Sequence, residues 1–134
     1  MRSSDDVSER RLAPGKKDVP YDIRERTFLF AVRVIKWVRT LPRDLGTQVA
    51  ARQLLEAATS IGANVEEADG AETSKDRVYK WALARNEARE SNYWTRLVRA
   101  AGADSTEGRA LEQESLELVR ILSSLIAKTK RSIA

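Results

Sequence analysis

The sequence predicts an all-α protein, an up-down-up-down antiparallel four-helix bundle. Apolar residues recur every three or four positions in four segments, none of which contains an internal proline. No run alternates apolar and polar residues as a strand does. Breaks of about three to six residues favour antiparallel neighbours. The four helices are expected over residues 22–40, 46–69, 73–101 and 105–131.

Capping residues and helix breakers define these boundaries. Serine, threonine and aspartate favour helix N-termini, whereas glycine and proline favour ends. The first helix is bounded by Asp22 and Pro42, and the second ends at Gly70. The third is bounded by Thr73 or Ser74 and by Gly102, and the fourth begins after Asp104-Ser105. Residues 1–20 are rich in charge and serine, and predict an unstructured arm. The bundle would then span residues 21–134.

Composition excludes several classes of protein. A chain of 134 residues makes one domain. It has no cysteine and no histidine, which removes disulfides, zinc–thiolate sites, histidine-based catalysis and the di-iron Glu-x-x-His pattern. We therefore expect no enzyme activity and no cofactor. No apolar run reaches the roughly 20 residues of a membrane span, and no signal segment begins the chain, so a cytoplasmic location is expected.

The first and fourth helices are apolar over more than one face. Most of the circumference of the first helix is apolar, with Phe28, Leu29, Phe30, Ala31, Val32, Val34, Ile35, Trp37 and Val38. The fourth helix carries a stripe of Leu111, Leu118, Leu122 and Leu125, with Leu116, Val119 and Ile126 beside it. A wide exposed apolar surface usually marks an interface, although a monomer core with a few exposed apolar residues is the alternative. Self-association is the favoured interpretation.

Each middle helix carries a stripe that is expected to pack in the core: Leu54, Ala58, Ile61, Val65 and Ala68 on the second, and Trp81, Ala84, Ala88, Ser91, Thr95 and Val98 on the third. Several polar residues fall beside these stripes. Ser60, Asn64 and Glu67 share one face of the second helix, and Glu87 and Glu90 lie among bulky groups of the third. We expect both glutamates to be at least half buried and paired with an arginine of a facing helix, such as Arg52. The alternative is a carboxylate site for Mg²⁺ or Mn²⁺ in a metal hydrolase, formed by Glu67, Glu87 and Glu90.

Basic residues form two rows. The first row, on the third helix, consists of Arg85, Arg89, Arg96 and Arg99; the second, on the first helix, consists of Arg26, Arg33 and Lys36. Guanidinium groups in a line suit phosphate contacts, and the chain carries a net charge of +4. Ordinary ion pairing along a solvated surface explains the rows equally well.

Three stretches resemble one bacterial family. They are Glu25–Phe28 with the run from Val34 to Pro42, Thr59–Asn64 through Ala68, and Glu87–Trp94 followed by Leu97. They resemble the four-helix-bundle family encoded within intervening sequences of bacterial 23S ribosomal RNA genes. That family is similar to the accessory variability determinant proteins of diversity-generating retroelements. The resemblance covers residues 22–132.

The resemblance implies a ring-like homo-oligomer, a pentamer around a central channel, without established enzymatic activity. The retroelement relatives bind nucleic acid and associate with a reverse transcriptase. Two functions follow as expectations: an RNA- or DNA-binding accessory or scaffold factor, or an adaptor that binds a reverse transcriptase. Ser60, Asn64, Glu67, Glu87, Glu90, Tyr93 and Trp94 match family motif positions and are interpreted as packing and inter-helix polar contacts. Asn86 stands where family members commonly have a basic residue.

Overall fold

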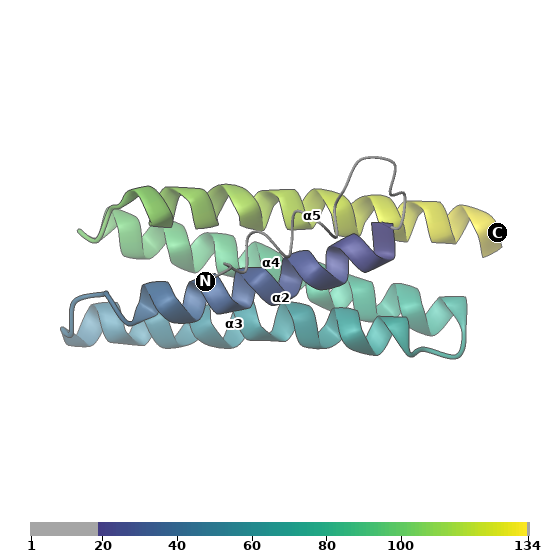
Figure 1. Cartoon of the computed structure of the whole chain (residues 1–134), viewed down its shortest axis with the longest axis horizontal. Coiled ribbons are helices and arrows are strands. Elements are labelled where there is room, and N and C mark those ends of the chain that lie inside the picture. Colours follow the sequence, from purple (N-terminus) through teal and green to yellow (C-terminus); the bar gives the residue numbers. More distant parts are fainter. Residues whose placement is uncertain (1–18, 134) are drawn as a thin grey trace, which may run out of the picture.

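Four antiparallel helices form the bundle, as predicted. The computed structural model describes residues 19–133 and contains α2 (Val19–Val38), α3 (Leu45–Asp69), α4 (Ser74–Ala100) and α5 (Thr106–Ile133), with no strand in that range. Figure 1 shows α3, α4 and α5 side by side along the molecule, while the shorter α2 crosses them obliquely. No helix in the described range is long and apolar enough to span a membrane. The predicted arm lies outside the described residues, except that residues 19 and 20 belong to α2.

The helix ends differ from prediction mainly in α2. This helix begins at Val19, so Asp22 lies inside it and is not its N-cap. A proline in the first turn, here Pro20, is compatible with this start because the first amides of a helix have no partner within it. At the other end, Thr40 Oγ1 donates to the carbonyl oxygen of Trp37 at 2.7 Å. This bond helps to close the helix before the chain turns.

The other three helices begin at capping side chains. The Asp44 carboxylate accepts from Thr47 N at 2.9 Å, and Thr73 Oγ1 accepts from Asp76 N at 3.0 Å. Ser105 Oγ accepts from Gly108 N at 2.9 Å. Each bond satisfies an amide that has no partner within its own helix. Thr73 and Ser105 were predicted in these places, and α3 begins one residue earlier than expected.

The predicted core stripes of α3 and α4 are buried. On α3 the stripe consists of Leu54, Ala58, Ile61, Val65 and Ala68, and on α4 of Trp81, Ala84, Ala88, Ser91, Thr95 and Val98. The buried hydroxyls of Ser91 and Thr95 donate to carbonyl oxygens one turn earlier in α4, at 2.9 and 2.8 Å. These two side chains therefore need no partner on another helix.

The outer apolar surface is larger on α2 than on α5. Phe28 is 62% exposed and Ile35 is 37% exposed on α2. The leucines of α5 at 111, 118, 122 and 125 are buried, as is Ile126, while Val119 is half-buried. Leu116 is 37% exposed, and Ile133 near the end of the helix is also exposed. The prediction of a broad apolar exterior is therefore confirmed for α2 and is wrong for most of α5, because the second apolar stripe of α5 also packs inward.

One end of the bundle is closed by a contact between α2 and the start of α5. Trp37 Nε1 donates to Ser105 Oγ at 3.2 Å, so the capping hydroxyl also orients the indole ring. A Cβ atom placed on Gly108 would lie 2.8 Å from Trp37 Cζ2 and 3.2 Å from Arg99 Cγ. Real Cβ atoms do not approach a ring carbon this closely. Only glycine therefore lets α5 pass this close to the buried indole.

We predict that Gly108→Ala lowers the free energy of unfolding by about 1–3 kcal/mol, because the rigid ring of Trp37 or the helix must move. Chemical denaturation at matched protein concentration measures the change. Gly62→Ala is the control, since a Cβ atom there would meet its nearest neighbour, Thr27 Oγ1, at an ordinary 3.5 Å. That variant should be neutral or more stable, as alanine is the better helix former. Equal effects of the two substitutions would contradict the packing argument.

Candidate nucleic-acid interface

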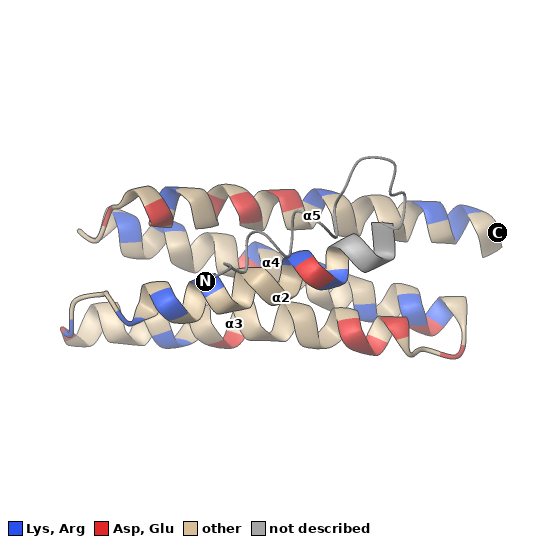
Figure 2. Cartoon of the chain, viewed as in Figure 1, with Lys and Arg blue, Asp and Glu red and all other residues tan. Residues whose placement is uncertain are grey.

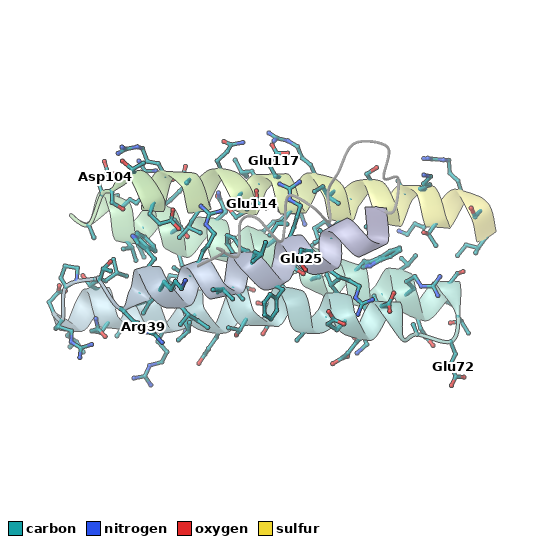
Figure 3. The ribbon with its side chains drawn as sticks, in the orientation of Figure 1. Glu25, Arg39, Glu72, Asp104, Glu114 and Glu117 are labelled. Carbon is teal, nitrogen blue, oxygen red and sulfur yellow. The ribbon has the colours of Figure 1, made fainter. Side chains whose placement is uncertain are left out.

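The basic row of α2 lies at the seam with α5. Arg26 Nη2 and Nε contact the two carboxylate oxygens of Glu114 at 2.7 and 3.0 Å. Arg33 makes the same two-pronged contact with Glu107, at 3.1 and 3.2 Å. Figure 3 labels Glu114 on α5, on the side of α2. Because both guanidinium forks engage carboxylates of α5, Arg26 and Arg33 do not form the row of free cations that the sequence suggested.

Lys36, the third member of that row, is exposed. No ion pair joins it to a carboxylate within residues 19–133. The α2 row therefore joins two helices through its first two members, and only its last member is left as an unneutralised cation. Figure 2 shows acidic residues concentrated in one half of α5, and Arg26 and Arg33 pair with two of the glutamates of this helix.

On α4, Arg99 is also neutralised. Its Nε contacts Asp104 Oδ1 at 2.8 Å, and its Nη1 pairs with Glu112. The hydrogen bond to Asp104 raises the pKa of the Arg99 guanidinium more than any other contact does. The same bond lowers the pKa of the Asp104 carboxyl. Arg99 thus ties the end of α4 to the following loop and to α5.

The other three arginines of the predicted α4 row, Arg85, Arg89 and Arg96, have no carboxylate within 4 Å among the described residues. Arg85 Nη1 donates to Ser123 Oγ at 3.3 Å, while its Nε is buried without a hydrogen-bond partner there. Arg89 is exposed. Arg96 is exposed too, and its guanidinium carbon lies 5.8 Å from the centre of the Tyr93 ring. These three residues, which we call the α4 arginine row, keep their charge available to an external anion.

Asn92 orients one member of the α4 arginine row. Its side chain is 8% exposed, and its Nδ2 donates to Glu112 O at 3.2 Å and to Ser115 Oγ at 3.0 Å on α5. Its Oδ1 then accepts from Arg96 Nε at 2.9 Å. The sequence showed only that Asn92 lies among the arginines. The signal in the sequence is that Asn92 follows the core residue Ser91 and lies one helical turn before Arg96, so its amide would be buried within reach of that arginine.

Asn64 and Glu67 were both expected to make inter-helix contacts, and the structure shows such a contact for Glu67 but not for Asn64. Asn64 Nδ2 donates to the carbonyl oxygen of Ser60 at 2.9 Å, within the same helix. Glu67 pairs with Lys80 of α4 at 2.6 Å, and this hydrogen bond raises the pKa of Lys80. Glu67 therefore joins two helices, as its place beside the apolar stripe suggested.

The predicted pairing of Glu87 and Glu90 with arginine is wrong. Glu90 is exposed, Glu87 is half-buried, and neither forms an ion pair within residues 19–133. Arg52 is exposed and unpaired over the same range, while Arg85 and Arg99 contact α5 instead. Partial burial, followed by the nearby charge of Glu90, raises the pKa of Glu87.

The metal-site alternative finds no support in the described part of the chain. No group of three or more aspartate, glutamate, cysteine or histidine side chains there could hold an ion. Glu67 is instead engaged in an ion pair with Lys80 of α4. Glu87 and Glu90 alone are a pair of like charges on one helix.

We predict that Glu87→Gln stabilises the protein by about 0.2–0.5 kcal/mol at pH 7, the size of one repulsive pair on a helix. A carboxyl whose pKa is raised by folding destabilises the fold once it ionises, so its cost grows as the pH rises through the raised pKa. The gain should disappear below about pH 4, where the carboxyl is protonated in both states. Thermal unfolding of both proteins at about pH 3.5 and pH 7 measures this, and an unchanged gain at the lower pH would contradict it.

Comparisons with known proteins agree with this fold. Residues 20–124 match the model of the 23S rRNA-intervening sequence protein family. Among solved structures, the chain is similar to a protein with unknown function from the S23 ribosomal protein family of Bacteroides thetaiotaomicron VPI-5482. The two are 30% identical with a TM-score of 0.72, over 78% of this chain and 97% of that one. The search of curated proteins gave no match. The family match extends from the first turn of α2 into α5, and the chain belongs to the 23S rRNA-intervening sequence protein family.

Proposed function

We propose that this protein is a non-enzymatic, homo-oligomeric accessory or scaffold factor that binds RNA or DNA through the α4 arginine row. The observation that carries the proposal is the absence of carboxylate partners for Arg85, Arg89 and Arg96 within the described residues, where Arg26, Arg33 and Arg99 are all paired. A guanidinium that is already neutralised gains little from a phosphate. Of the six arginines in the two predicted rows, these three are left without a carboxylate partner among the described residues, which makes them the natural phosphate ligands of the rows.

The spacing of the α4 arginine row suits a polyphosphate strand. Four and seven residues separate its members, a rise of about 6 Å and about 10 Å along the helix. One strand of a duplex presents a phosphate about every 3.4 Å along its axis. The arginines can therefore meet phosphates at intervals of about two and three nucleotides. The ring of Tyr93, which is 49% exposed beside Arg96, adds a surface on which an unpaired base can stack.

Self-association is proposed through the outward face of α2. Phe28 and Ile35 are one heptad apart and both exposed, with Ala31 and Val32 between them. Covering such a face with a second copy removes apolar surface from water. A closed ring would repeat the α4 arginine row around its axis, so that weak contacts of single subunits add along one nucleic acid. Five subunits are the expectation that the family resemblance supplies.

We predict that Arg89→Ala combined with Arg96→Ala lowers the affinity for RNA and DNA about tenfold at about 0.15 M salt. The slope of log affinity against log salt should fall by about 2, because each neutralised phosphate contributes about 0.9 to that slope. Fluorescence anisotropy with labelled single-stranded and duplex probes, titrated over salt, measures both quantities. Arg85 is left intact in this experiment because it also contacts α5.

Arg43→Ala combined with Arg52→Ala is the matched control. Both residues are exposed and lack carboxylate partners within residues 19–133, and replacing them removes the same net charge. The control should reduce binding only slightly. Equal losses of affinity in both double variants would mean that only the net charge matters and not the position of the arginines. An affinity of the native protein that does not change with salt would overturn the phosphate-binding proposal.

We predict that Phe28→Ser shifts the native oligomer to smaller species, because it removes the most exposed apolar side chain among residues 23–38 of α2. Light scattering coupled to size-exclusion chromatography gives the subunit number. Tyr79→Ser is the control, since Tyr79 is 60% exposed on α4, close to the 62% of Phe28. A monomeric native protein at high micromolar concentration, or dissociation by both substitutions alike, would contradict this interface.

The adaptor function is the second candidate. Tyr79, Tyr93 and Leu97 are all exposed on α4, at 60%, 49% and 40%, which favours a protein partner on this helix. A reverse transcriptase gene beside this gene, with template and variable repeats, would favour the adaptor role. A gene located inside a ribosomal RNA gene would favour the first proposal.

A further inference from the structure

We propose that the cleft between the end of α2 and the α4–α5 loop binds a small planar molecule that carries one anionic group. The cleft has a volume of about 510 Å³, within the range of about 300–1,000 Å³ that is usual for small-molecule sites. It lies at the end of the bundle where Figure 3 labels Asp104. Two segments far apart in the sequence, 33–42 and 103–107, form its walls.

The apolar part of the cleft is rigid and partly aromatic. Trp37 and Leu41 are buried members of the core, and Pro42 and Ala103 extend the same surface. The indole of Trp37 is held by the bond from its Nε1 to Ser105 Oγ and by the close approach of Gly108. The ring is 5% exposed and forms part of the rigid apolar floor of the cleft, so little side-chain freedom is lost when a flat apolar group binds over it.

The charges around the cleft select an anion. Both carboxylates that line it are already paired: Glu107 with Arg33, and Asp104 with Arg99 and Arg109. Lys36 is the lining charge that has no ion pair among residues 19–133, and it is exposed at the rim. An anionic group on the ligand therefore finds a cation there and meets no unpaired carboxylate in the lining.

The planar anion has two common sources, a nucleoside monophosphate and an aromatic carboxylate. The test uses ¹H–¹⁵N spectra of the full chain, in which the indole N–H of Trp37 is identified by its loss in Trp37→Phe. Adenosine 5′-monophosphate and indole-3-acetate are the probes, and adenosine and indole-3-acetamide are their neutral counterparts.

At least one anionic probe should shift the Trp37 signal, and its neutral counterpart should bind at least tenfold more weakly. The indole signals of Trp81 and Trp94 should not move, and the probe that binds identifies the source.

Two variants make the test specific. Lys36→Glu should weaken the anionic probe at least tenfold, whereas Lys75→Glu, an exposed lysine in the first turn of α4, should not. Ala103→Phe should fill the cleft and abolish the shift, with the Trp81 and Trp94 signals confirming that the fold is retained. Arg89→Ala with Arg96→Ala should leave the shift intact, which separates this site from nucleic-acid binding. An unmoved Trp37 signal at millimolar probe, equal binding of neutral and anionic probes, or no effect of Lys36→Glu would overturn the proposal.

Discussion

The bundle depends on close packing along α4, the helix that contacts both α3 and α5 extensively. Its core-facing positions in the middle of the helix are small: Ala84, Ala88, Ser91 and Thr95 are all fully buried. Small side chains let helix backbones approach closely, which stabilises the bundle through close packing. This stabilisation would be lost if the buried hydroxyls had no hydrogen-bond partners. Ser91 and Thr95 find those partners in their own helix. The core stripe of α4 can therefore pack closely and contain hydroxyl groups, because these hydroxyls need no hydrogen-bond partner on α3 or α5.

The carboxylates of α5 decide which arginines remain free. Glu107 and Glu114 are one heptad apart and pair with Arg33 and Arg26 of α2, whereas Glu112 pairs with Arg99 of α4. These contacts attach α2 and the end of α4 to α5, so the pairs are part of the packing of the bundle. What is left on α4 is a shorter row than the sequence suggested. Its charge is nevertheless more accessible than that of a row interleaved with carboxylates.

The α4 arginine row and the cleft differ in the chemistry that they can recognise. The row presents charge along one edge of a helix, which suits an extended polyanion and requires no enclosed volume. The cleft combines a fixed indole, an apolar wall and Lys36, the one lining cation without an ion pair among the described residues, which suits one small molecule. Arg99 connects the two features through its ion pairs. It pairs with Asp104, which lines the cleft, and with Glu112, whose backbone oxygen accepts from Asn92, the residue that binds Arg96.

The sequence by itself determined the four helices, most of their ends and the core stripes. Periodicity and capping act within one helix, so Leu54, Ile61 and Ala88 could be assigned to the core without knowledge of any neighbour. Three features could not be assigned in that way: the contact of Trp37 with Ser105 and Gly108, the ion pairs of Arg26 and Arg33, and the exposure of Glu90. They depend on the rotation, stagger and tilt of one helix against another, which a single helix does not encode. Only the tertiary structure decided which charges neutralise one another, because an ion pair forms only where two side chains meet within a few ångströms.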